Sequence, residues 1–213
     1  GPGHTHYQGI IINPKTALQI ANDRILHTLQ SQSQTLDLSG LIGLSHLPTN
    51  IKGLKHLTTI KLANTSIIDI SMLSELPNLT TVDLSLTNIE DVTSLSKLSK
   101  LETLWLSNSK VSSLIFLSSL NKIKSLHLVN LKLDDFSFLS ELVDLEHLDL
   151  RHTTFNDMKI ISSLNKLRSI NLSNSSVFDI TNLNNNSSLE SIELGHTLVE
   201  NFNIINSLIN LKT

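Results

Sequence analysis

The sequence of 213 residues predicts an α/β fold. The expected architecture is a right-handed solenoid with a parallel concave β-sheet, short helices or turns on the convex side and a helical N-terminal cap. Three observations lead to this prediction. Apolar residues recur with a 22-residue period, each period contains a short run of alternating apolar and polar residues, and only 4% of the residues are aromatic. A core of Leu and Ile suits thin stacked coils better than a thick globule.

Residues 13–32 are expected to form the helical cap. Asn13 suits the N-cap position and Pro14 suits the first turn of a helix. Apolar residues then follow at helical spacing: Leu18, Ala21, Ile25, Leu26 and Leu29. A helix here would cover the open end of the first coil, as the ends of a solenoid require.

Residues 1–12 are expected to be a tag remnant and a flexible start. Gly1-Pro2-Gly3 resembles what a protease leaves after it removes a purification tag. The native N-terminus, with any targeting signal, would then lie outside this sequence.

Residues 33–213 carry the repeat. A looser 24-residue coil ends at His56, and seven 22-residue coils run from Leu57 to Asn210 without insertion or deletion. The fourth position of each 22-residue coil is Ile, Val or Leu, and the sixth is always Leu. This alternation predicts a short strand with one buried face, and stacking buries the apolar edges that a single coil would expose. After Asn210 we expect a truncated strand with an open C-terminal edge, either because the sequence is trimmed there, the preferred interpretation, or because a partner or a second copy covers the edge.

The thirteenth position of the coils is a column of short polar residues: Asp69, Asp91, Ser113, Asp135, Asp157, Asp179 and Asn201. All three residue types are favoured helix N-caps, so we expect a short helix or turn to follow on the convex side. A metal-binding or catalytic ladder is the alternative interpretation. Capping explains better why Asp, Ser and Asn interchange.

The repeat resembles the 22-residue class of leucine-rich repeats, which includes the bacterial internalins and a small regulatory subunit of protein phosphatase-1. Residues 57–76, LTTIKLANTSIIDISMLSEL, are similar to its pattern and its I-x-D-I-x-x-L-x-x-L second half. The resemblance covers residues 33–213 and implies the leucine-rich-repeat fold. It departs at the ninth position, where Thr or Ser replaces the usual Asn, so we expect a hydroxyl ladder beneath the strands. Leu131 breaks this column, and Asn186 replaces a Leu, so both turns are expected to be altered.

Composition excludes several classes of function. The net charge of -3, without a basic run, argues against a nucleic-acid partner. The absence of cysteine excludes disulfides and thiolate chemistry, and no apolar stretch approaches the roughly 18 residues of a membrane span. No catalytic motif is found, so we expect no enzyme activity, no cofactor and no metal. A cytosolic protein, or one secreted into a host cell, fits better than a disulfide-forming extracellular one.

The candidate binding surface centres on Trp105, the only tryptophan, at the fifth position of its coil. This position is expected to face solvent in every coil, and an exposed Trp on a rigid sheet is typical of a binding hot spot. A ring that lies flat over its neighbours is the alternative. The other candidate contact residues are Asp83, Leu86, His127, Val129, His147, Asp149, Arg151 and His152. His127, His147, Asp149 and His152 also suggest a metal site, but no residue can be named that would hold these ligands in position by hydrogen bonds.

The second position of the coils alternates in charge: Glu102, Lys124, Glu146, Arg168 and Glu190. We expect a ladder of ion pairs across adjacent strands.

The sequence thus predicts a non-enzymatic protein–protein interaction module that binds on its concave face. A bacterial effector that acts on a host protein is the finer expectation. The alternatives are a substrate-targeting domain of a larger enzyme, a regulatory subunit of a phosphatase or ligase complex, or a solenoid that self-associates through its open C-terminal edge.

Overall fold

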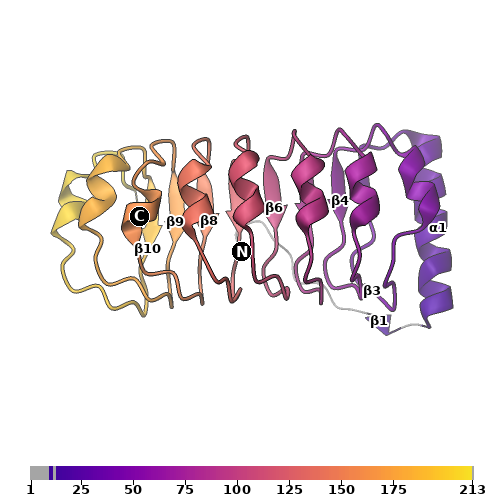
Figure 1. Ribbon diagram of the computed structural model, residues 1–213, viewed down its shortest axis with the longest axis horizontal. Helices are drawn as coiled ribbons and strands as arrows, with labels where there is room; N and C mark the ends of the chain where they lie inside the picture. The colour runs from indigo at the N-terminus through magenta and orange to yellow at the C-terminus, as the bar shows by residue number, and fades with distance from the viewer. Residues whose placement is uncertain (1–9, 12, 213) are drawn as a thin grey trace. The chain divides into compact units, whose positions relative to one another are not determined.

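The computed structural model describes residues 10–11 and 13–212 of the chain. They form a solenoid of stacked coils, as the repeat predicted, with parallel strands on one side and short 3-10 helices on the other (Figure 1). The chain divides into two compact units, Gly1–Val111 and Ser112–Thr213. Each unit is built from the same kind of coil and contributes four strands to the parallel sheet.

The first unit begins with helix α1 (Pro14–Ser31), which confirms the predicted cap. The Asn13 side chain accepts a hydrogen bond from the Lys15 backbone N–H at 2.8 Å, and Pro14 occupies the first turn. The helix contacts β2 (Thr35–Asp37), β3 (Leu41–Ile42) and the 3-10 helix η1 (Thr49–Gly53). The short strand β1 (Ile10–Ile11) pairs in parallel with β3. Most of residues 1–12, where a tag remnant was expected, lie outside the described residues.

The face that α1 buries differs from the prediction. Its buried residues are Ala17, Ala21, Ile25 and Thr28. Three leucines that the sequence assigned to this face are instead exposed, by 43% for Leu18, 52% for Leu26 and 42% for Leu29. Each of these leucines follows a buried residue in the chain and is therefore turned about 100° away from it around the helix axis. The small alanines let the helix lie close to the first coil.

The sheet of the first unit contains β2, β4 (Thr59–Lys61), β5 (Thr81–Asp83) and β6 (Thr103–Trp105), in that order. All these pairs are parallel. Thr59 lies opposite Thr81 and Thr81 opposite Thr103, an offset of one 22-residue period. Thr35 lies opposite Thr59, a slightly longer offset, as the looser first coil predicted. The 3-10 helices η2 (Ser71–Glu75) and η3 (Thr93–Lys97) complete these coils.

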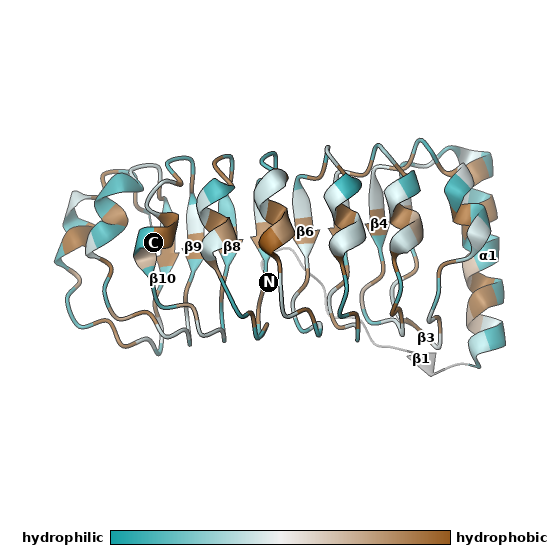
Figure 2. Cartoon of the chain, in the orientation of Figure 1, coloured by the Kyte–Doolittle hydropathy of each residue, from teal (hydrophilic) through white to brown (hydrophobic). Residues whose placement is uncertain are grey.

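The second unit repeats this arrangement. Its strands are β7 (Ser125–His127), β8 (His147–Asp149), β9 (Ser169–Asn171) and β10 (Ser191–Glu193), paired in parallel in that order. Its 3-10 helices are η4 (Ile115–Ser119), η5 (Ser137–Glu141), η6 (Met158–Ile161), η7 (Thr181–Asn185) and η8 (Asn203–Ser207). Apolar bands recur along the strands and 3-10 helices of each unit (Figure 2).

The core of each unit consists of the predicted apolar columns. Leu62 and Leu84 in the first unit, and Leu150 and Leu172 in the second, have no exposed surface. Phe155 is the largest side chain that is fully buried, and its ring meets the edge of Phe136 with centroids 5.4 Å apart. Since every inner coil is covered by a copy of its own pattern, the same positions are buried throughout.

The column at position thirteen precedes the 3-10 helices, as predicted, but only Asp157 is itself the N-cap residue. In the other coils the N-cap is the apolar residue at position fourteen. In six of the seven coils the side chain at position thirteen accepts a hydrogen bond, 2.8–3.0 Å long, from the backbone N–H two residues later. These backbone bonds are the main reason why the pKa values of Asp69, Asp135 and Asp179 lie below their usual range. The acidic column is therefore a structural feature of the turns.

The ninth-position hydroxyls do not form the expected ladder between coils. The hydroxyls of Thr65, Thr87 and Thr153 donate to the backbone carbonyl three residues earlier in their own coil, at 2.7–2.8 Å. A threonine side chain is too short to span the roughly 4.8 Å between strands, as asparagine can. Leu131 is buried in this column, yet its backbone N–H still donates to Leu128 at 3.3 Å, so the expected change in its turn is not seen.

Asn186 was expected to loosen its turn, and this expectation was wrong. The 3-10 helix η7 forms before it, as in the other coils, and the side chain is completely buried. Its amide nitrogen donates to the carbonyls of Ile161 and Leu164, each at 3.0 Å. Its Oδ1 has no hydrogen-bond partner in the described structure. The turn tolerates the buried amide because its nitrogen makes two hydrogen bonds. The unpaired oxygen remains a cost to stability.

Replacement of Asn186 by leucine is expected to raise the free energy of unfolding by about 1–2 kcal/mol. Leucine occupies this position in the other six coils. The change removes a buried acceptor that lacks a partner, while the carbonyls of Ile161 and Leu164 keep the backbone bonds that they already accept. Urea denaturation followed by circular dichroism measures the effect. The exposed neighbour change Asn185→Leu is the control, and a loss of stability in Asn186→Leu would show that the two amide bonds outweigh the desolvation.

Candidate functional site

The first unit brings three of the predicted contact residues to the end of neighbouring strands. Asp83 on β5 lies directly opposite Trp105 on β6. Leu86 follows in the turn after β5, where its backbone N–H donates to the Ser107 carbonyl at 2.9 Å. Trp105 is half-buried and Leu86 is exposed. Unit one therefore presents a half-buried aromatic ring on β6 and an exposed apolar side chain in the turn after β5.

The fifth position is not uniformly exposed, and the prediction was wrong for three of its residues. Asp83, His127 and Asp149 have only 4%, 6% and 3% of their surface exposed. The two aspartates fold back onto the chain, where they accept hydrogen bonds from the backbone N–H groups of Ser85 and Arg151, at 3.0 and 3.2 Å. Asp37 and Asn171 do the same two residues later in their own turns.

Sequence reasoning missed this second capping column. Its signal was present: the fifth position is Asp or Asn in four coils, and the bonded amide lies two residues later, the same spacing as in the thirteenth-position caps. Short polar side chains favour such local bonds to the backbone. These residues therefore shape the turn that carries their neighbours.

In the second unit, Asp149 and Arg151 form an ion pair at the end of β8. The guanidinium Nη2 lies 2.7 Å from Oδ2 of the carboxylate, and Nε donates to both of its oxygens, at 3.0 and 3.1 Å. The Asp149 side chain is 4% exposed and that of Arg151 30%. The hydrogen bonds to Asp149 raise the pKa of Arg151 further above its ordinary value. Arg151 thus offers a surface cation that is held in place.

The other predicted residues of the second unit lie on β7, on β8 and in the turns that follow these strands. His127 lies opposite Asp149, and its Nε2 is 2.8 Å from the Ser125 hydroxyl. His147 is exposed, with Nδ1 2.7 Å from the Ser169 hydroxyl. Val129 is half-buried, and His152 is exposed in the turn. Among the residues that the structure describes, no group of three or more His, Asp or Glu side chains could hold a metal ion.

The eighth position adopts a left-handed backbone conformation, with φ between 54° and 61°, in all seven 22-residue coils. Its residues are Asn64, Leu86, Asn108, Asn130, His152, Asn174 and His196. Asn and His are enriched in this conformation, whereas a bulky apolar residue is a genuine outlier. Leu86 is therefore a local exception, which the sequence-based reasoning included only as an apolar neighbour of Trp105.

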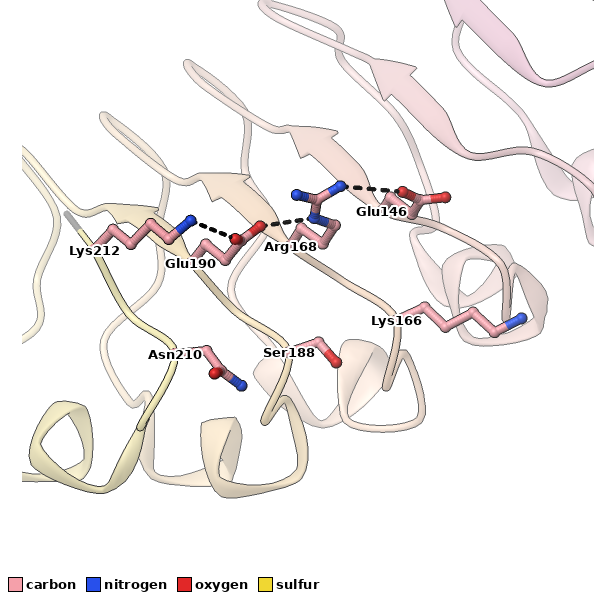
Figure 3. Close-up of a pocket in the computed structure, with 7 residues that line it drawn as sticks. All are labelled: Glu146, Lys166, Arg168, Ser188, Glu190, Asn210 and Lys212. Carbon is pink, nitrogen blue, oxygen red and sulfur yellow. Dashed lines mark hydrogen bonds and ion pairs between the residues drawn. The ribbon is translucent and has the colours of Figure 1, made fainter.

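The predicted charge ladder is confirmed in the second unit, where it lines a surface hollow of about 530 Å³ (Figure 3). Glu190 lies between two cations, 2.6 Å from Arg168 and 2.9 Å from Lys212, and Arg168 also lies 3.9 Å from Glu146. Lys166 and two polar residues complete the lining. Because these charges are exposed to solvent, each pair contributes little to stability. The ladder orders the strands and leaves no concentrated charge of one sign.

The ladder predicts an acid-sensitive contribution to stability. Hydrogen bonds from Arg168 and Lys212 lower the pKa of Glu190 from 4.5 to about 2. A carboxyl whose pKa is lowered by folding stabilises the fold above its unfolded pKa, and this contribution is lost as the pH falls from 4.5 toward 2. The melting temperature of the parent chain should therefore exceed that of Glu190→Gln near neutral pH, and the difference should shrink below pH 4.5. A difference independent of pH would contradict this.

No helix in the described part of the chain has the length and apolar character needed to cross a bilayer.

Comparison with known proteins identifies the fold. The sequence matches no protein-family model and no curated protein. Its structure is similar to an internalin (InlF) from Listeria monocytogenes, with a TM-score of 0.82 and 25% identity over 94% of this chain and 64% of InlF. Internalin C2 (InlC2) of the same organism also has a TM-score of 0.82, with 19% identity over 97% of this chain and 98% of InlC2.

A leucine-rich-repeat protein of Leptospira interrogans is also similar. It has a TM-score of 0.67 and 20% identity, over 87% of this chain and 61% of its own. This chain thus spans less than two thirds of InlF and of the Leptospira protein, but nearly all of InlC2.

Proposed function

We propose that this leucine-rich-repeat protein, which is structurally similar to Listeria internalins, is a non-enzymatic module that binds another protein through its sheet side. The observation that carries the proposal is the contrast between fixed and variable columns. Positions four and six are apolar in every coil, whereas position five changes from Lys61 to Trp105 and Glu193. A rigid scaffold with variable side chains on one surface is suited to recognition.

The composition of the two clusters supports a protein partner. In the first unit, Trp105 and Leu86 supply aromatic and apolar contact area. In the second, Arg151 supplies a cation fixed by Asp149, and the same unit also carries the exposed His147 and the half-buried Val129. Trp and Arg are enriched among the residues that dominate protein interfaces, and fixed side chains lose little entropy on binding.

The similarity to internalins favours a finer proposal, that the chain is a bacterial effector which acts on a host protein. The alternating charges of the ladder and the overall charge of -3 give no support to a polyanionic partner.

Affinity capture with matched variants tests the proposed function. The sheet-side variant carries Trp105→Ala and His147→Ala, since His127 is buried and its loss would disturb the fold. Ile115→Ser, on η4 and 60% exposed, is the control on the opposite side. Host-cell proteins enriched by the parent chain are identified by mass spectrometry, purified and titrated by calorimetry.

We expect the sheet-side variant to bind the identified protein at least about tenfold more weakly and the Ile115→Ser control to bind it unchanged. Circular dichroism must show that both variants fold. Equal affinity of the parent chain and the sheet-side variant would reject the sheet side as the binding surface.

A further inference from the structure

The turn after β5 departs from the other turns in one residue. Leu86 has φ 57°, in the left-handed region that Asn or His occupies in the other six coils. Its backbone N–H donates to Ser107 at 2.9 Å, as that of Asn64 donates to Ser85 at 2.9 Å. The backbone is therefore the same in both turns, and only the side chain is unfavourable. A β-carbon and bulky apolar group are disfavoured in this conformation.

The core does not account for this leucine. Leu86 is 38% exposed, whereas the leucines of the apolar columns in the same coil, Leu79 and Leu84, have no exposed surface. The preceding residue, Ser85, also lowers stability. It is 2% exposed, and its hydroxyl has no hydrogen-bond partner in the described structure. Residues that break local rules without a structural gain are found at functional sites.

The turn positions beside Leu86 carry no charged residue, although the row of Trp105 on the strands includes Asp83 and Lys61. The seventh and eighth positions of the first unit are Ala63, Asn64, Ser85, Leu86, Ser107 and Asn108. Ser107, which accepts the Leu86 hydrogen bond, lies two residues after the half-buried Trp105. An apolar centre with an uncharged polar rim is the usual anatomy of an interface core, where charged residues are depleted.

We propose that Leu86, with Trp105 on the adjacent strand, is a hydrophobic anchor that receives an apolar side chain from an uncharged segment of a protein partner. This proposal rests on the proposed function and adds to it the chemical character of the partner segment. The left-handed leucine is then a functional residue whose conformational strain is offset only in the complex.

A library of random linear peptides displayed on phage tests the anchor on the intact chain. Peptides selected by the parent chain should share an apolar residue flanked by uncharged ones. Because Trp105 is the only tryptophan of the chain, its fluorescence reports on this site alone. We expect a selected synthetic peptide without tryptophan to shift the Trp105 emission to shorter wavelength as water is displaced.

Two reciprocal substitutions separate strain from binding. Leu86→Asn should raise the melting temperature by about 2–4 °C, because Asn tolerates the left-handed conformation. It should also lower the affinity for the peptide at least about tenfold. Asn174→Leu places the same strain in an exposed turn of the second unit, where φ is 60°. It should lower the melting temperature by a similar amount and leave the affinity for the peptide unchanged.

Three outcomes would overturn the anchor: the parent chain selects no peptide, Leu86→Asn binds the peptide as well as the parent, or Leu86→Asn melts at a lower temperature because Leu86 is a packing residue. The first leaves the proposed function to be decided by affinity capture. The second or third outcome, obtained with a peptide that binds, would reject only the role of Leu86 and would leave the proposed function unaffected.

Discussion

Replacement of Phe155 by alanine is expected to lower the free energy of unfolding by about 3–5 kcal/mol. Phe155 occupies the eleventh position of its coil, is 1% exposed and meets the Phe136 ring at 5.4 Å and an interplanar angle of 78°. Its loss removes both the burial of a large side chain and the edge-to-face contact. It also leaves a cavity that stacked coils cannot close, because the hydrogen-bonded strands on either side set their spacing.

Urea denaturation followed by far-ultraviolet circular dichroism measures this loss. Phe178→Ala is the matched control, since that ring is 60% exposed and its removal should change stability by no more than about 0.5 kcal/mol. A loss below about 1.5 kcal/mol for Phe155→Ala would mean that the coil collapses around the vacated space. Phe155→Leu should recover part of the stability.

Arg151→Met is expected to cost about 2–3 kcal/mol, because it leaves the Asp149 carboxylate buried without its cation. The Asp149 side chain is 4% exposed and receives three hydrogen bonds from the guanidinium. The backbone N–H of residue 151 remains as a donor at 3.2 Å and limits the loss. Arg168→Met is the control: its guanidinium is also paired but lies exposed to solvent, so its loss should lower the free energy of unfolding much less than Arg151→Met does.

A double-mutant cycle shows whether the pair or the residual charge causes the loss. In Asp149→Asn with Arg151→Met, the amide still accepts the backbone bond and no charge is buried. The double variant should therefore be more stable than Arg151→Met alone. If it is equally unstable, the packing of the arginine stem, and not its charge, sustains the turn.

This ion pair changes the interpretation of the second cluster. The sequence suggested Asp149 as an exposed contact residue. Its carboxylate instead accepts hydrogen bonds from the guanidinium and from the backbone N–H of Arg151. Its part in the proposed function is to position Arg151. The residues that can meet a partner are then the exposed portions of Arg151, His147 and His152.

The 22-residue period by itself determined the fold of the repeats. Each inner coil is covered by a copy of the same pattern, so the apolar spacing within one coil decides what is buried in the next. The strands, the 3-10 helices and the thirteenth-position caps follow from residues close together in the chain. The N-terminal helix was predictable for the same reason, because Asn13 and Pro14 act on the backbone beside them.

Only the tertiary structure decided how side chains share space between coils. The face of α1 that is buried depends on the surface of the first coil. Ala17 and Ala21 pack against this surface, whereas Leu18 is exposed. The burial of Asp83 and Asp149 depends on a turn that folds their side chains onto the backbone. The strain at Leu86 depends on a left-handed conformation shared by all seven turns. The hydropathy pattern does not predict this backbone angle. Spacing along a chain thus specifies which positions repeat, but exposure and strain depend on the atoms that surround each position.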